Sequence, residues 1–257
     1  MRRGIHRPST RDALRAEMLR IRGTRRLVGI ALTAILATVA SAATVALLVD
    51  ALRPGPAEAA VVAVHRGSAA QVAIAVVVAL LVGGDHRHGT ATLAWMQLGG
   101  RRRLAIVAAV QAALAAAVAL GSASAALAIV TGVAAAPMHA VPAVVAAHVG
   151  LMVVWSAWLA CVATLTGSTL ATLACGLVVP IAVEPVVSGL LAAAGASGVQ
   201  RLLPTTALRM LGELAAGGER VVIAPASTSD AWLVPCVVVV WTCVLAALAW
   251  RRASRAP

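Results

Sequence analysis

Long apolar segments are the feature of this sequence that most limits its fold. About 20 apolar residues in a helix are needed to cross the ~30 Å hydrocarbon layer of a bilayer. Helices suit this task because they bond every backbone NH and carbonyl group within one segment. The sequence therefore predicts an all-α, polytopic membrane protein with six transmembrane helices. These spans, rich in Ala and Val, are expected at about 27–49, 68–83, 104–133, 141–165, 170–194 and 231–250.

The composition agrees with this assignment and excludes several classes of protein. Of the 257 residues, 61% are hydrophobic and 12% charged, whereas a soluble domain is about half apolar and a quarter charged. Six spans leave no room for an ATPase domain, and the sequence has no lysine for a phosphate-binding loop that ends in Gly-Lys-Ser/Thr. We find no catalytic constellation in the spans, so we expect no enzyme. The net charge of +12 is attributed to membrane topology, so no nucleic-acid partner is expected.

The arginines predict the orientation of the spans. If the N-terminus is cytoplasmic, 16 of the 21 basic residues, all arginine, fall in inner segments and five in outer loops. This bias agrees with the positive-inside rule, and an even number of spans puts both termini in the cytoplasm. The predicted units are a cytoplasmic amphipathic segment over 1–26, the transmembrane domain over 27–250 and a cytoplasmic tail over 251–257.

The N-terminal segment predicts a helix of its own, from Ser9 to Arg26. Ser9 and Asp12 have the spacing of a capping box. Leu14, Met18 and Ile21 recur at helical spacing among arginines, which is typical of a helix in the lipid headgroup layer. Whether such a helix only anchors the chain or also contacts a partner stays open.

The segment between the second and third predicted spans carries a distinctive pattern. Asp85 is followed, after three further residues, by Gly89-Thr90, then by an apolar stretch, Gly99 and the basic cluster Arg101–Arg103. Glycine permits a sharp change of chain direction. Threonine can cap a short helix, here from Thr90 to Leu98. The pattern therefore predicts a short, rigid helix that lies against the inner membrane surface between two spans.

This pattern resembles the membrane (permease) subunits of the type-2 family of ATP-binding-cassette transporters. The family usually has Glu where this chain has Asp85, and Pro where it has Gly99. A Lys common early in the family's third span is missing here. The resemblance implies that this loop contacts a separate ATPase subunit, which holds ATP and magnesium, while this chain holds no cofactor. The ATPase-coupling loop would include Asp85, Arg87, Gly89, Thr90, Arg101, Arg102 and Arg103.

The same loop also raises the question of a metal site at Asp85, His86 and His88. Two histidines separated by one residue do not have the usual helical zinc spacing, and no cysteine or further acid lies near them in the sequence. We therefore expect no metal site here.

Glu184 is the one charged residue inside a predicted span, between Pro180 and Pro185. At ~1.5 Å per residue it lies about 20 Å from the inner surface, and the prolines are expected to bend or break the helix. Two interpretations stay open: part of a translocation path or gate, or a structural acid bound by backbone NH groups of a re-entrant turn. The resemblance favours the second, because family members often follow Glu-Pro with a re-entrant helix and a Leu-Pro segment, here Leu203-Pro204.

These observations favour a permease subunit in a bacterial plasma membrane, expected to export a hydrophobic or amphipathic compound as a homodimer or heterodimer. Two alternatives remain. An ion-coupled secondary transporter would use Glu184, although such proteins place several polar groups at paired helix breaks. A non-transporting membrane assembly protein is the other. Transport that depends on nucleotide would distinguish the first function from the others.

Overall fold

The chain is helical throughout the part that the computed structural model describes, which comprises residues 9–22, 29, 30, 32, 36, 40, 69–87, 98–134, 141–215 and 230–255. No strand occurs among these residues. The helices are α1 (Thr10–Arg22), α4 (Ala69–Val78), the π-helix η2 (Ala79–Gly83), α5 (Gly84–Arg87), α7 (Gly100–Ala134), α8 (Val141–Thr166), α9 (Thr169–Leu173), the π-helix η3 (Ala174–Val183), α10 (Glu184–Ala193), the 3-10 helix η4 (Ser197–Leu202), α11 (Pro204–Ala215) and α12 (Asp230–Ser254).

Helices long and apolar enough to cross a membrane occur at four of the predicted spans. They are Gly100–Ala128, Pro142–Thr166, Thr169–Ala193 and Ala231–Ser254, at the third to sixth predicted positions. The shorter apolar helix Ala70–Gly83 coincides with the second. The first predicted span, 27–49, lies outside the described residues apart from five helical positions. The all-helical prediction is thus confirmed for the described residues, and four of the six predicted spans coincide with helices whose length and composition allow them to cross a membrane.

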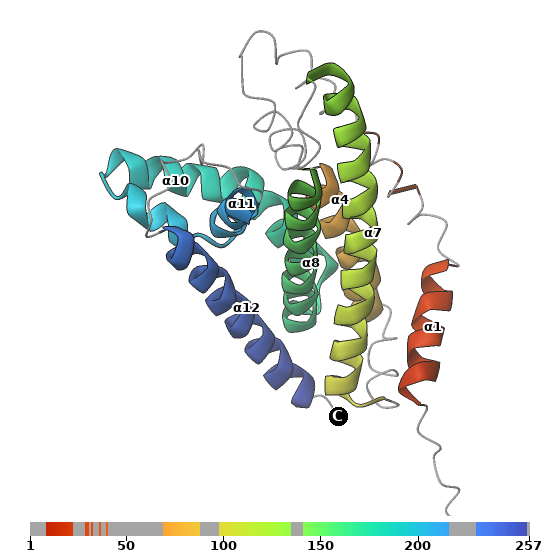
Figure 1. Cartoon of the computed structure of the whole chain (residues 1–257). Helices are drawn as coiled ribbons and strands as arrows, with labels where there is room; N and C mark the ends of the chain where they lie inside the picture. Colours follow the sequence, from red (N-terminus) through yellow and green to blue (C-terminus); the bar gives the residue numbers. More distant parts are fainter. Residues whose placement is uncertain are drawn as a thin grey trace, which may run out of the picture.

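The helices follow an up-and-down path (Figure 1). Figure 1 shows α7 and α8 antiparallel and α12 crossing back toward the end of the bundle where α7 begins. At the opposite end α10 lies across the direction of α7 and α8. We call the end that holds Gly100 and the last turn of α12 the basic end, because Arg101–Arg103, Arg251 and Arg252 gather there. The opposite end, formed by α10, η4 and α11, is called the far end.

Glycine and serine set the tight turn between α8 and α9. Gly167, at φ 61°, ends α8 and donates its NH to Ala163 O at 2.9 Å. Ser168 then caps α9, because its Oγ accepts the NH of Ala171 at 3.3 Å. A positive φ is accessible to glycine at little cost, and serine oxygen satisfies an NH group that lacks an intrahelical partner. Two residues therefore reverse the chain between two long apolar helices.

Small side chains and two tryptophans fill the centre of the bundle. Ala115 and Ala119 of α7 and Ala160 and Ala163 of α8 are buried in one cluster, and such residues allow helix backbones to approach closely. The rings of Trp155 and Trp158 lie in the same cluster with their centroids 6.5 Å apart. The Trp158 indole donates its Nε1–H to Thr242 Oγ1 at 2.9 Å, which links α8 to α12.

The helix that begins at Thr169 passes both prolines without a break. Its middle part, η3, is a π-helix that contains Pro180, and the NH of Glu184 donates to Val179 O five residues earlier. Proline has no NH and its ring clashes with the carbonyl four residues before it, so the wider π register accommodates it. Pro185 stands where the π-helix η3 changes to the α-helix α10. The prolines were expected to bend or break the helix, and they do not break it.

The N-terminal helix α1 begins at the predicted capping box. The NH of Ser9 donates to Asp12 Oδ2 at 3.2 Å, and the NH of Asp12 donates to Ser9 Oγ at 3.1 Å. The described part of this helix ends at Arg22, and the remainder of the predicted helix, to Arg26, lies outside the described residues. Ala13 packs against Ile106 and Val110 of α7, so α1 is attached to the bundle.

Replacing Gly100 by alanine is expected to destabilise the fold, because α7 begins in backbone contact with α12. A Cβ at Gly100 would lie 2.0 Å from the carbonyl oxygen of Ala253. Overpacking of this kind costs about 1–3 kcal/mol, more than the ~1 kcal/mol that alanine gains over glycine in a helix. Gly150→Ala in α8 is the matched control, because a Cβ there meets nothing within 4 Å. Unfolding by dodecyl sulfate titration measures both variants. Equal stability of the two would contradict the close approach of α7 and α12.

Candidate functional site

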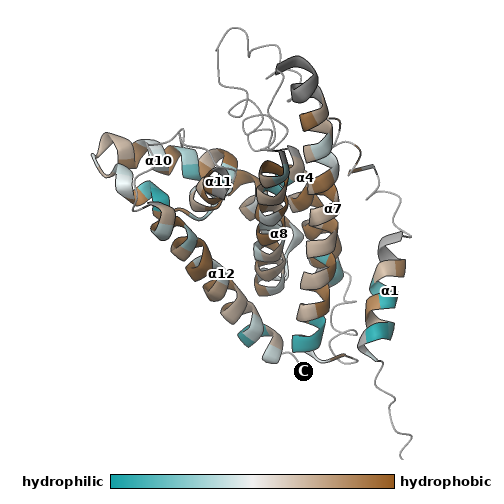
Figure 2. Cartoon of the chain, viewed as in Figure 1, coloured by the Kyte–Doolittle hydropathy of each residue, from teal (hydrophilic) through white to brown (hydrophobic). Residues whose placement is uncertain are grey.

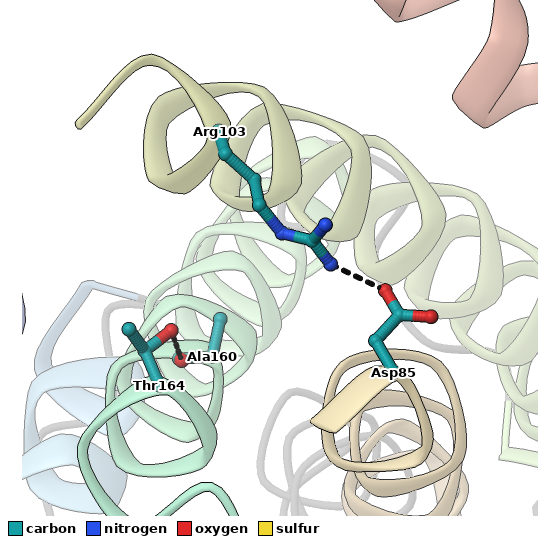
Figure 3. A network of polar contacts seen from close by, with 4 residues as sticks. All are labelled: Asp85, Arg103, Ala160 and Thr164. Carbon is teal, nitrogen blue, oxygen red and sulfur yellow. Dashed lines mark hydrogen bonds and ion pairs between the residues drawn. The ribbon is translucent and has the colours of Figure 1, made fainter. Parts of the chain in front are cut away.

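A buried ion pair joins the two ends of the predicted coupling loop. The Arg103 guanidinium, in the first turns of α7, donates from Nη2 to Asp85 Oδ2 in α5 at 2.6 Å (Figure 3). Asp85 is 8% exposed and Arg103 9% exposed. A charge-assisted bond at this distance is strong, and both charges are held away from water. The pair therefore fixes the distance between the beginning and the end of the loop.

The elements that carry this ion pair are packed closely on their neighbours. A Cβ at Gly83, two residues before Asp85, would lie 2.7 Å from Thr169 Cα at the start of α9. On α8, which Figure 3 shows beside the pair, Thr164 Oγ1 donates to Ala160 O at 2.8 Å. The segment before Asp85 therefore has backbone contact with α9, while the ion pair joins α5 to α7.

The predicted basic cluster divides into side chains with different surroundings. Arg101 is exposed, and its Cζ lies 5.3 Å from the centroid of the Trp250 ring in α12. Arg102 is half-buried, and Arg103 is buried against Asp85. A cation over an indole face is attracted by the ring quadrupole. Of the three arginines expected to face an ATPase, Arg103 is therefore turned into the bundle, which the sequence pattern did not reveal.

The structure describes two further residues of this loop, Arg87 and Gly99. Gly89 and Thr90 lie outside the described residues, and Arg87 is the last residue of α5. Gly99 has φ +77°, between helical Leu98 and the start of α7, which is the change of direction expected of a glycine there. Within the described ranges, no three His, Cys, Asp or Glu side chains are placed to hold a metal ion.

Glu184 binds the beginning of α11 at the far end of the bundle. Its Oε1 accepts the NH of Thr205 at 2.9 Å, and its Oε2 accepts the NH of Thr206 at 2.9 Å and the Thr206 hydroxyl at 3.0 Å. The residue is 4% exposed. This is the type of contact that the structural interpretation of Glu184 requires, with NH groups that belong to the first turn of a helix.

The sequence of α11 explains why it needs an acid from elsewhere in the chain. The first NH groups of a helix have no intrahelical partner. Pro204 occupies the first position, where a missing NH does no harm, and Leu203 before it is extended. Leu203 offers no side-chain oxygen as a cap, so Thr205 and Thr206 bond to Glu184 instead. A carboxylate at a helix N-terminus is also favoured by the helix dipole.

Two further contacts, not anticipated from the sequence, hold the far end together. Gln200 Nε2 donates to Ser188 O at 2.7 Å, which joins η4 to α10. Trp241 Nε1 donates to Leu202 O at 3.0 Å, which joins α12 to η4. Neither residue belongs to a sequence motif, and no local signal in the sequence marks either contact. Together with Glu184, these side chains connect α10, η4, α11 and α12.

Comparisons with protein-family models, with curated proteins and with solved structures find no match for this chain.

Proposed function

We propose that this chain is the permease subunit of an ATP-binding-cassette transporter, driven by a separate ATPase subunit. The observation that carries the proposal is the buried Asp85–Arg103 pair, 2.6 Å long, at the base of the loop that resembles the family's coupling loop. A loop that moves a membrane helix has to transmit force without yielding where it joins the bundle. An ion pair shielded from water gives such a joint, since it is weakened little by salt.

The far end of the bundle supports the same proposal. The family resemblance implies an acid and a proline, then a re-entrant helix and a Leu-Pro segment. In this chain Glu184-Pro185 begins α10, and Leu203-Pro204 begins α11. Glu184 joins these two elements through three hydrogen bonds, which supports its structural interpretation over a role in the pathway. An ion-coupled transporter that uses Glu184 therefore becomes the less favoured alternative.

In this proposal two permease subunits, identical or different, form the pathway in the plasma membrane of a bacterium, with both termini in the cytoplasm. ATP and magnesium act on the partner ATPase, while this chain contributes the pathway and the coupling loop. The apolar side chains of its spans suit export of a hydrophobic or amphipathic compound. Side chains such as Val178, Ile181 and Val186 are exposed along η3 and α10, where lipid or a second subunit would cover them.

The proposal is tested by affinity purification of the tagged full-length chain from native membranes, with mass spectrometry of the proteins that accompany it. We expect a soluble ATPase in stoichiometric amount. Replacing Arg101–Arg103 by alanine should reduce the recovered ATPase severalfold. This change removes the exposed Arg101, the half-buried Arg102 and the ion pair with Asp85. The double variant Arg201→Gln/Arg209→Gln, at the far end, is the control and should keep the ATPase.

Absence of any ATPase, after crosslinking and under conditions that trap ATP, would contradict the permease proposal. Transport without nucleotide would then favour the secondary transporter. Stable assembly with other membrane proteins and no transport would favour the assembly protein.

A further inference from the structure

One face of α12 changes from apolar to basic along its length. Val240, Val244, Leu248, Arg251 and Arg255 follow one another at intervals of three or four residues, which places them on one side of a helix. All five are exposed. The opposite side, at Ala249 and Ala253, is buried in the bundle. The exposed stripe is thus lipid-compatible over two turns and cationic at the basic end.

The first turn of α7 adds to this cationic surface. Gly100 touches the backbone of Ala253, and Arg101 lies over the Trp250 ring at 5.3 Å. Trp250 itself is 46% exposed. Figure 2 shows hydrophilic colour where α7 and α12 meet at this end, next to hydrophobic colour farther along both helices. We call Arg101, Arg251, Arg252 and Arg255, with Trp250, the basic ledge.

The basic ledge has a large excess of positive charge. Asp85, in α5, bonds Arg103, which is buried two residues from Arg101. The acids of α1, Asp12 and Glu17, belong to a helix on the other side of α7 in Figure 1. The positive end of the α7 dipole adds to this charge at Arg101, whereas the negative end of the α12 dipole favours Arg251 and Arg252. The like charges of the ledge still repel one another, and an external anion would relieve this repulsion.

We propose that the basic ledge binds the phosphate headgroup of an anionic phospholipid, with the acyl chains on the apolar part of the same α12 stripe. Arg251 and Arg252 would contact the phosphate, while Val244 and Leu248 contact hydrocarbon. Tryptophan is enriched at the depth where headgroups begin, which agrees with Trp250 beneath Arg101. An acidic protein surface would not need the adjoining exposed apolar stripe, so the combined surface favours a lipid. This inference does not depend on the proposed function.

The test uses the full-length chain in nanodiscs of phosphatidylcholine and phosphatidylglycerol in equal amounts, with native mass spectrometry of the lipids that the released protein retains. An arginine near an anionic surface contributes roughly a fivefold preference. We therefore expect the wild-type chain to retain phosphatidylglycerol over phosphatidylcholine by at least roughly tenfold. Arg251→Gln/Arg252→Gln should bring this ratio close to one. Arg201→Gln/Arg209→Gln removes the same charge at the far end and should leave the ratio unchanged.

Two further measurements test the lipid preference without the glutamine variant, in case that variant does not fold. Arg251→Lys/Arg252→Lys keeps the charge and should keep most of the preference, and high salt should reduce the preference of the wild-type chain. Equal retention of both lipids by the wild-type chain would overturn the proposal, as would an equal loss in both double glutamine variants. Loss of a co-purifying acidic protein from Arg251→Gln/Arg252→Gln, with the lipid ratio intact, would overturn it in favour of a protein partner.

Discussion

Glu184→Ala is expected to lower the free energy of unfolding by about 3–5 kcal/mol, since two buried NH groups and a hydroxyl lose their acceptor at once. The affected groups are the NH groups of Thr205 and Thr206 and the Thr206 hydroxyl. Glu184 is 4% exposed, so water has little access to these groups and cannot readily replace the carboxylate. The measurement is unfolding by dodecyl sulfate titration, followed by tryptophan fluorescence.

Two variants separate the contributions at this site. Glu184→Gln keeps one carbonyl acceptor but turns an amide donor toward the second NH, so its effect should be intermediate. Thr206→Val removes the hydroxyl alone and should cost about 1 kcal/mol. If Glu184→Ala unfolds like the wild-type chain and Glu184→Gln abolishes a pH-dependent uptake that needs no nucleotide, Glu184 acts in a pathway and the structural interpretation is wrong.

The second large effect is expected at the buried Asp85–Arg103 ion pair. Asp85→Ala or Arg103→Ala should each cost about 3–5 kcal/mol, because removing one member of a buried ion pair is strongly destabilising. The double variant Asp85→Ala/Arg103→Ala should cost less than the two single changes together, since no charge then stays buried. A double-mutant cycle by unfolding titration gives the coupling between the two side chains.

Charge reversal provides the sharper control for this pair. Asp85→Arg/Arg103→Asp restores an ion pair and also places an acid at the N-terminus of α7, where the helix dipole favours it. We expect this variant to recover most of the stability lost in the single variants. If the effects of the single variants on the free energy of unfolding are additive, the interaction between Asp85 and Arg103 does not stabilise the fold. Severalfold loss of nucleotide-dependent transport in the single variants, recovered on reversal, would link the pair to coupling.

The long apolar runs made most of the fold predictable. The third to sixth spans were found within a few residues, because uninterrupted Ala- and Val-rich segments leave few alternatives in lipid. The capping box at Ser9 and the direction change at Gly99 were also predictable, since each depends on neighbours in sequence. Such local signals need no knowledge of how helices pack.

The contacts of the candidate sites were less predictable because they join distant residues. Asp85 and Arg103 were both recognised, but as separate elements of a motif, and nothing local indicates that Arg103 turns inward. The acceptor at Glu184 was expected to meet backbone NH groups, yet the donors, Thr205 and Thr206, lie about twenty residues away. The π register of η3 was missed, because a proline in a sequence indicates disruption without stating its form.

The contact between Gly100 and Ala253 has a consequence for the order in which the chain is made. These residues meet across most of the transmembrane region, and a ribosome that adds about 5–20 residues per second needs on the order of ten seconds to pass from one to the other. During that interval α8 and η3 are synthesised, but Gly100 has no Ala253 to contact. The contact with α7 therefore forms only after α12 has been made, long after the residues of α7 that take part in it.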